Sequence, residues 1–234
     1  MTLNQIQSFA HGIGVSIEPS QVQMLDLYLD LLLDANAQFN LTRITDPAQI
    51  ETRLIGDSLA LVPHIPRAAR SLLDVGSGGG VPGMPIAIAR PRLEVTLMDA
   101  TGKKVRFLGE TAAVIGANNV TAVQARAEEL ARERDHRERY DVVTARAVAR
   151  LATLIELALP FLRIGGRGIF PKGSAAEEEL DEAAHAIRLL GGEARPVQES
   201  PVEGTRIVLI DKIRPTPSEF PRRTGIPNKT PLPG

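Results

Sequence analysis

Residues 71–83 read SLLDVGSGGGVPG, and this stretch decides the class of fold. Its apolar start, with Asp74 near the end, predicts a buried strand over residues 71–75. The loop that follows is glycine in four of five positions: Gly76, Gly78, Gly79 and Gly80. Glycine adopts positive φ angles freely, and without a Cβ it lets a ligand approach the backbone. A strand, a glycine loop and a helix in this order predict a site for a nucleotide-bearing cofactor.

Strands and helices are expected to alternate around this segment. The apolar patterns predict further strands at residues 94–98, 120–124, 141–145, 167–170, 193–197 and 206–210, with helices at 82–89, 103–115, 127–134, 151–162 and 175–190. Only a short turn joins the last two strands, which predicts an antiparallel hairpin. The chain therefore reads as a doubly wound α/β sheet of seven strands.

Three regions are expected along the chain. Residues 1–66 predict an N-terminal helical extension packed on the core, with helices at 20–39 and 48–61, and residues 67–212 hold the sheet. Residues 213–234 are rich in proline and basic side chains, which predicts an extended tail. The charged run RERDHRERYD, residues 132–141, is interpreted as a solvated loop.

Composition excludes several functions. The 234 residues are 43% hydrophobic with a net charge of −1, so the chain can bury a full core but carries no uniformly basic coat for nucleic acid. The absence of cysteine excludes disulfides, thiolate metal sites and cysteine nucleophiles. The four histidines are scattered, so no metal is expected. No signal peptide or membrane-length apolar run is visible, and we expect a cytoplasmic monomer without membrane contact.

The glycine loop can be read in two registers, which correspond to two cofactors. Gly78, Gly80 and Gly83 fit the dinucleotide pattern G-x-G-x-x-G, so the motif alone leaves NAD open. Read from the end of the strand, however, Asp74, Gly76, Gly78 and Gly80 resemble the acidic-x-G-x-G-x-G loop of S-adenosylmethionine-dependent methyltransferases. The sheet of those enzymes also ends in an antiparallel hairpin. Both features favour S-adenosylmethionine.

The next two strand ends carry further candidates for the cofactor. Asp99 closes the second strand, 19 residues after Gly80, where a carboxylate accepts ribose hydroxyls; its alternative role is to cap the helix that begins near Lys103. Ala127 and Glu128 follow the third strand, where methyltransferases commonly contact adenine. Since the carboxyl ends of parallel strands meet at one edge of a sheet, these residues predict one nucleoside site.

The end of the fourth strand restricts the methyl acceptor. It reads DVVTARAVA and lacks the [DN]-P-P-[YF] motif used for exocyclic base nitrogens, while methylation of cytosine C5 needs a cysteine. Guanine N7 carries a lone pair and no proton, so its attack on the methyl group needs no general base. Alignment alone can supply roughly 7–11 kcal/mol of the barrier. Methylation of a small molecule on oxygen or nitrogen remains open at this point.

From about Phe39 to Leu232 the chain resembles the bacterial methyltransferases that modify guanine N7 in 16S ribosomal RNA. The segments that carry the resemblance are FNLT (39–42), R-x-x-x-D-S (53–58), LLDVGSGGGVPGMP (72–85), LMDATGKKVRFL (97–108), QARAEEL (124–130), TARAVARL (144–151), KG (172–173) and FPRRTGIPNKTPL (220–232). The chain departs from the family at Leu54 and Gly56, where relatives usually have histidine and leucine.

The resemblance implies a Rossmann-like methyltransferase fold, S-adenosylmethionine as methyl donor, and 16S ribosomal RNA or a small-subunit assembly particle as partner. Together with the loop and spacing arguments, it predicts this cofactor set: Asp74, Gly76, Gly78, Gly80, Val81, Asp99, Ala127, Glu128 and Arg146. No residue is assigned to the chemical step itself. The candidates for positioning the substrates are Asn40, Arg146 and Lys172.

Basic side chains are the expected contacts to RNA. Arg146 is assigned to the cofactor carboxylate or an RNA phosphate, with a structural ion pair as the alternative, and Lys172 to phosphate, with a solvated loop lysine as the alternative. The tail adds a local excess of positive charge that can follow RNA: Lys212, Arg214, Arg222, Arg223 and Lys229. With 3% aromatic residues, phosphate contacts should outweigh base stacking. A small-molecule methyltransferase, a NAD-linked oxidoreductase and a catalytically idle nucleotide-binding module are the competing readings.

Overall fold

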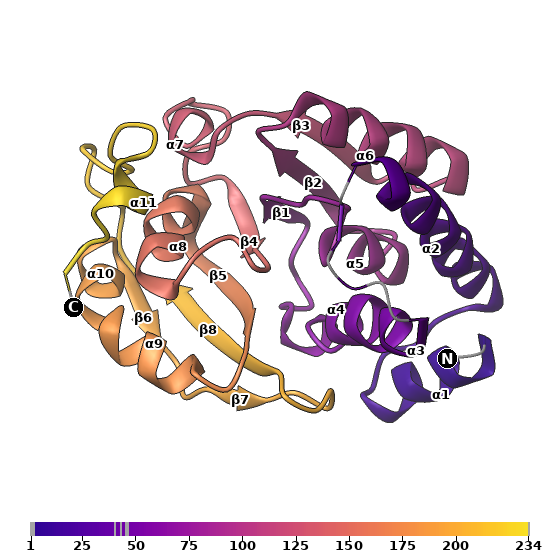
Figure 1. The fold of residues 1–234 in the computed structure, drawn as a ribbon. Coiled ribbons are helices and arrows are strands. Elements are labelled where there is room, and N and C mark those ends of the chain that lie inside the picture. The colour runs from indigo at the N-terminus through magenta and orange to yellow at the C-terminus, as the bar shows by residue number, and fades with distance from the viewer. Residues whose placement is uncertain (1–2, 40, 43, 45–46, 234) are drawn as a thin grey trace.

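The computed structural model describes residues 3–39, 41–42, 44 and 47–233, and it shows a central sheet covered by helices on both faces (Figure 1). The strands are β1 (Ser71–Val75), β2 (Glu94–Asp99), β3 (Val120–Gln124), β4 (Tyr140–Thr144), β5 (Leu162–Lys172), β6 (Gly192–Ala194), β7 (Gln198–Glu199) and β8 (Arg206–Lys212). They are ordered β3-β2-β1-β4-β5-β8-β6, and β7 also pairs with β8. β1 to β5 are parallel, whereas β8 is antiparallel to β5, β6 and β7.

The doubly wound fold with a terminal antiparallel pairing is therefore confirmed, with one correction to the number of strands. The strand expected at residues 193–197 is two short strands, β6 and β7, which both pair with β8, so the described sheet has eight strands instead of seven. Pro196 lies between them. Proline has no N–H to donate to a ladder, so the pairing is interrupted there.

Helices cover both faces of the sheet. Side chains alternate between the two faces along each strand, so every strand can contribute to both interfaces. The helical segments before the sheet are α1 (Leu3–Gly12), α2 (Pro19–Phe39), α3 (Pro47–Ile50), η1 (Glu51–Gly56), α4 (Asp57–Leu59) and η2 (Val62–His64). Those that follow are α5 (Gly83–Ala89), α6 (Gly102–Ile115), α7 (Ala127–Leu130), α8 (Leu151–Ala158), η3 (Leu159–Phe161), α9 (Ala176–Glu182), α10 (Ala184–Leu189) and α11 (Ile226–Lys229). Leu72 packs in the cluster with Tyr28 of α2, and its neighbour Leu73 packs in the other cluster with Leu154 of α8.

The N-terminal helices form part of the wall around the carboxyl edge of the sheet. The long helix expected at residues 20–39 is confirmed as α2. The helix expected at 48–61 is confirmed as the uninterrupted helical segments α3, η1 and α4, of which η1 is a π-helix that the sequence did not predict. Ser58 Oγ donates to Leu54 O at 2.5 Å within these turns. Such π turns are frequent at functional sites, and this one contains Arg53 of the R-x-x-x-D-S segment, whose Asp57 and Ser58 follow in α4.

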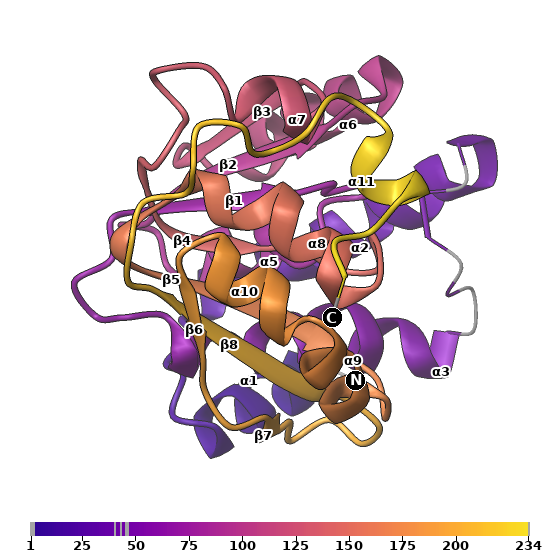
Figure 2. The same cartoon turned by 90° about the vertical axis from the view of Figure 1, so that its left-hand side faces the viewer.

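The C-terminal tail packs on the molecule, a placement that its sequence does not specify. Phe220 and Leu232 are buried in the core that contains α8. Arg137, in the charged run expected to be solvated, is half-buried and donates to Phe220 O at 2.8 Å and Thr216 O at 2.9 Å. Figure 2 shows the tail crossing the molecule beside α7 and α8 to the short helix α11. The division of the chain at residues 66 and 212 stays a prediction.

No helix within the described part of the chain is long and apolar enough to cross a membrane.

Candidate functional site

The glycine loop after β1 has the strained backbone that its composition predicts. Gly76, Gly78 and Gly80 have φ angles of +70°, +57° and +101°. Two side chains hold the loop: Asp99 Oδ2 accepts from Gly78 N at 3.1 Å, and the buried Tyr28 hydroxyl donates to Gly79 O at 2.9 Å. The loop is thus fixed from β2 on one side and from α2 on the other.

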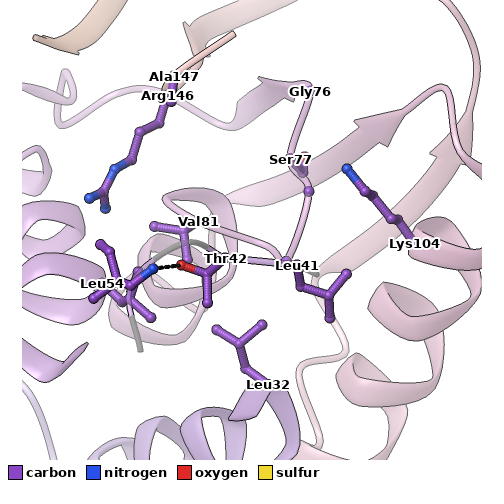
Figure 3. Close-up of a pocket in the computed structure, with 13 residues that line it drawn as sticks. Leu32, Leu41, Thr42, Leu54, Gly76, Ser77, Val81, Lys104, Arg146 and Ala147 are labelled. Carbon is purple, nitrogen blue, oxygen red and sulfur yellow. Dashed lines mark hydrogen bonds between the residues drawn. The ribbon is translucent and has the colours of Figure 1, made fainter. Parts of the chain in front are cut away.

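A cavity of about 430 Å³ opens against this loop (Figure 3). Its described walls are Leu32, Leu41, Thr42, Ile44, Leu54, Gly76, Ser77, Gly78, Gly79, Val81, Lys104, Arg146 and Ala147. The volume lies in the range typical of small-molecule sites, roughly 300–1,000 Å³. Figure 3 shows the two cationic side chains, Arg146 and Lys104, on opposite sides of the loop. We call this the first cavity.

Four residues of the predicted cofactor set line the first cavity: Gly76, Gly78, Val81 and Arg146. Asp74 and Gly80 are buried and do not line it. The Asp74 carboxylate accepts from Gly83 N at 3.1 Å, at the start of α5, while its Oδ1 has no hydrogen-bond partner among the described residues. Burial raises the pKa of Asp74 to about 7. Asp74 therefore supports the loop and does not face the cavity.

The remaining predicted residues lie at the ends of the next two strands. Asp99 is buried; besides the Gly78 amide it accepts from Thr101 N at 2.8 Å, and Lys104 Nζ lies 3.8 Å from its Oδ2. Ala127 and Glu128 begin α7 after β3, and both are buried. Since β1, β2 and β3 are parallel neighbours, these residues share the edge of the sheet with the glycine loop. That edge is where open α/β sheets bind ligands.

A second cavity of about 480 Å³ adjoins the first, and the two share Arg146 and Ala147. Its described walls are Arg53, Asp57, Arg146, Ala147, Val148, Ala149, Pro171, Lys172, Gly173, Glu179, Gly204 and Thr205. Ala147 has a φ of +54°, a left-handed conformation that is rare for a residue with a Cβ. Strain of this kind is concentrated at functional sites, and here it lies in the wall common to both cavities.

Arg146 is held at this shared wall by the N-terminal turns. Its guanidinium lies 3.3 Å from Asp57 Oδ2 and also donates to Arg53 O. Burial lowers the pKa of Arg146, although Asp57 acts in the opposite direction. Burial raises the pKa of the Asp57 carboxyl, which also accepts from Thr205 Oγ1 at 2.8 Å.

Lys172 lines the second cavity and is not a solvated loop lysine. Its side chain is 11% exposed; Nζ donates to Ala149 O at 2.9 Å and to Glu179 Oε2 at 2.8 Å. The same carboxylate oxygen accepts from Leu151 N, at the start of α8, at 2.7 Å. The third positioning candidate, Asn40, lies outside the described residues.

The sequence did not predict the helical residues that line the first cavity or hold its glycine loop. Leu32 and Tyr28 read as ordinary core residues of an amphipathic helix, and nothing local reveals that they meet the glycine loop. Lys104 belongs to the segment LMDATGKKVRFL, but nothing in that segment indicates that its side chain lines a cavity. Leu54 did give a signal, because it is one of the two departures from the resemblance described above, and it lies in the wall of the first cavity.

The chain resembles known proteins both in sequence and in fold. The sequence model of one family, described as rRNA small subunit methyltransferase G, matches residues 21–207. A protein of Roseiflexus castenholzii named ribosomal RNA small subunit methyltransferase G is 44% identical over 233 residues, 98% of this chain and all of that protein. A protein of the same name from Dehalococcoides mccartyi is 41% identical over 234 residues, again 98% of this chain and all of that protein.

Among solved structures, the fold resembles a SAM-dependent methyltransferase from Aquifex aeolicus, with a TM-score of 0.58 and 14% identity over 74% of this chain and 97% of that one. At that identity the likeness concerns the fold alone. The sequence matches reach further, since they extend over nearly the full length of the chain. On these grounds the chain belongs to the rRNA small subunit methyltransferase G family and is a methyltransferase.

Proposed function

We propose that the protein transfers a methyl group from S-adenosylmethionine to N7 of a guanine in 16S ribosomal RNA, without a general base. The family membership supports the class of reaction and of substrate. The observation that supports the base-free mechanism is the set of ionisable side chains in the two cavities. Of the Asp, Glu, His, Lys, Arg and Tyr types, the described walls of the first cavity hold only the cations Lys104 and Arg146. The carboxylates of the second cavity, Asp57 and Glu179, are paired with Arg146 and Lys172.

The residues around the first cavity fit S-adenosylmethionine. The glycine loop presents backbone without Cβ atoms to the ligand, and Arg146 can bind its carboxylate, while Lys104 lies on the other side of the loop beside Asp99. Asp99, at the end of β2, is suited to the ribose hydroxyls, and the start of α7 at Ala127 and Glu128 to the adenine. When bound, this cofactor supplies an electrophilic methyl group on a sulfonium sulfur.

The acceptor needs alignment and no proton removal. The N7 lone pair forms the new bond to carbon as the carbon–sulfur bonding pair moves to sulfur, and the positive charge passes to the purine. Since no proton leaves N7, the residues of the site have only to position the base and exclude competing acceptors. Two cavities that share a rigid wall at Arg146 and Ala147 suit this task.

We assign the second cavity to the target guanosine. Arg53, Arg146 and Lys172 line it and provide positive charge for the neighbouring phosphates. Its carboxylates are already engaged, Asp57 with Arg146 and Thr205, and Glu179 with Lys172 and Leu151 N. The major groove of an A-form helix is too deep and narrow for a protein to reach N7, so the guanosine must come from a loop or leave its stack.

The decisive experiment follows labelled methyl from S-adenosylmethionine into unmodified 16S ribosomal RNA and small-subunit particles. We expect one labelled guanosine that becomes cleavable by borohydride and aniline, the reaction of 7-methylguanosine. Label on a base amino group or a carbon atom would refute the N7 assignment. Label found only in small molecules would favour the competing small-molecule methyltransferase, and calorimetry that detects NAD but not S-adenosylmethionine would favour the oxidoreductase.

A further inference from the structure

The C-terminal segment 216–230 is attached to α7, the helix that begins with Ala127 and Glu128. Gly225 N donates to Glu128 Oε1 at 2.9 Å, and Thr224 Oγ1 donates to Glu129 Oε1 at 3.1 Å. The turn that follows α7 is attached as well, because Arg132 donates to Glu219 O and Pro221 O. Both acidic side chains of the helix, together with Arg132 and Arg137 after it, thus reach the same segment.

The other side of this segment is anchored on α8. Arg222 meets the fully buried Glu156 through its backbone N at 2.8 Å, Nε at 2.9 Å and Nη2 at 2.6 Å. Thr153 Oγ1 donates to Pro227 O at 3.1 Å. Because Glu156 is fully buried, its charge depends on this partner, and the pair fixes the position of Arg222 on α8. Segment 216–230 therefore joins α7 to α8, and Figures 1 and 2 show it running beside both helices.

Helix α7 depends on such external support. It has four residues, and its N-cap residue, Arg126, makes no side-chain cap hydrogen bond. Isolated helices shorter than ~12–15 residues are marginal in water, so a single turn takes its position from tertiary contacts. The buried Leu130 and Ala131 fix the far end of the turn. The near end is fixed by Glu128 and its hydrogen bond to Gly225.

We propose that segment 216–230 is a strap that positions the start of α7 and thereby sets the affinity for the adenine half of the cofactor. The proposal rests on the proposed function, which assigns the adenine to Ala127 and Glu128. It gives the buried part of the tail a role distinct from the RNA contact expected from its charge. Arg222 is paired with Glu156, and the buried Lys212 donates hydrogen bonds to Leu159 O and Leu190 O.

Because of thermodynamic linkage, the proposal predicts two measurable effects, one on ligand affinity and one on the stability of the strap. If the strap strengthens adenine binding, the bound ligand must stabilise the strap by the same free energy. A tail that merely adds to global stability has no such coupling. The amide of Gly225 is a local reporter, because its hydrogen bond to Glu128 is the contact in question.

The first experiment compares two shortened chains. Ending the chain after Arg223 removes Thr224 and Gly225 but keeps the Arg222 side chain opposite Glu156; ending it after Thr230 keeps all three. Binding of S-adenosylhomocysteine and of adenosine is measured by calorimetry, at a temperature where circular dichroism finds each chain folded. We expect both ligands to bind about 5- to 50-fold more weakly to the chain ending after Arg223. The chain ending after Thr230 should bind them like the full chain.

The second experiment uses the full-length chain, so that it does not depend on how the shortened chains fold. Thr224→Val removes the hydroxyl that donates to Glu129, and Ser218→Ala, at an exposed hydroxyl of the same segment, is the matched control. We expect only Thr224→Val to weaken adenosine binding. S-adenosylhomocysteine should slow hydrogen exchange at the Gly225 amide in the unmodified chain.

The outcomes separate this proposal from the proposed function. If the unmodified chain fails to bind S-adenosylhomocysteine, the proposed function itself fails. If it binds but the ligand leaves Gly225 exchange unchanged, or the chain ending after Arg223 binds adenosine as tightly as the full chain, the strap is overturned while the methyltransferase proposal stands. Weaker binding of both ligands together with ligand-slowed exchange would establish the coupling.

Discussion

The Arg146 guanidinium lies 3.3 Å from Asp57 Oδ2 and donates to Arg53 O, which joins the loop after β4 to the π-helical turn of the N-terminal region. Arg53 and Asp57 are four residues apart, so both lie on the same side of these helical turns. Asp57 is in turn held by Thr205, just before β8. The N-terminal extension is thus part of the wall between the two cavities, in addition to covering the core.

Replacing Arg146 should impair methyl transfer much more than replacing a neighbouring arginine. Arg146→Gln removes a hydrogen-bonded charge worth about 1.5–3 kcal/mol, so we expect a roughly 10- to 100-fold lower single-turnover rate. Arg150→Gln is the matched control in the same loop, because Arg150 is exposed and pairs with Glu182 at the surface. Rates are measured with saturating cofactor on small-subunit RNA.

A double-mutant cycle tests whether the effect of Arg146→Gln on the rate depends on the ion pair with Asp57. Arg146→Gln and Asp57→Asn should be less than additive in their effects on the rate, since the two side chains form one pair. Strict additivity, or equal rates for the Arg146 and Arg150 variants, would show that the pair does not position the reacting groups.

Adding a methyl group to the glycine loop should block cofactor binding without unfolding the protein. A Cβ on Gly76 would lie 2.8 Å from Val148 Cγ2, and the φ of +70° disfavours any side chain. Gly116→Ala is the control, because Gly116 has a similar φ of +76° but no neighbour within 4 Å of its Cβ position. Both variants should lose about 1 kcal/mol of stability from the backbone term. Only Gly76→Ala should lose affinity for S-adenosylhomocysteine in calorimetry.

The contact with Val148 can be tested separately. Val148→Ala removes the clashing methyl groups, so it should restore part of the affinity lost in Gly76→Ala. If Gly76→Ala binds as tightly as the unmodified chain, the glycine loop does not form the cofactor site.

The sequence predicted those parts of the fold that depend on local pattern. The strands at 71–75 and 120–124 have the expected bounds, because short apolar runs between turn residues leave little freedom. The site was less predictable. Tyr28 binds the glycine loop from 51 positions away in the chain, and its spacing in α2 is that of any core residue. A pattern of one helix cannot specify which loop that helix will meet.

The tail shows the same limit from the other direction. Its prolines and basic side chains predict an extended segment with a local excess of positive charge. In the structure Arg222 is neutralised by Glu156, 66 positions earlier, and Arg137 binds carbonyl groups of the tail. Ion pairs between distant positions convert a charged sequence into packed structure, and composition cannot reveal them.

The buried Asp74 should make the unliganded protein less stable as the pH rises through neutrality. Burial raises its pKa to about 7, so the folded state retains a proton that the unfolded state releases near pH ~4. The contribution of Asp74 to stability is therefore fully present below about pH 4. It is lost as the pH rises from there towards 7, by about 1.4 kcal/mol per pH unit. Asp74→Asn keeps an acceptor for Gly83 N and carries no charge. In urea denaturation its stability relative to the unmodified chain should increase between pH 5 and 7.

The contribution of Asp74 is isolated by the difference between the two proteins. Other groups titrate in both chains, so their effects cancel in the comparison. A difference in unfolding free energy that stays constant from pH 5 to 7 would contradict the raised pKa.

The rate of methyl transfer should be independent of pH wherever the protein is folded and saturated with cofactor. Asp57 is the carboxylate that a base-dependent mechanism would use, because it lines the second cavity and burial raises its pKa. If it accepted a proton, the single-turnover rate would fall as acid protonates it, and Asp57→Asn would abolish turnover. With N7 as acceptor no proton is lost, so we expect a flat profile between about pH 6 and 9.

Asp57→Asn should then lower the rate by loosening Arg146 while leaving the profile flat. A rate that declines in mild acid only when Asp57 is present would assign it as a general base and exclude N7 attack as the mechanism.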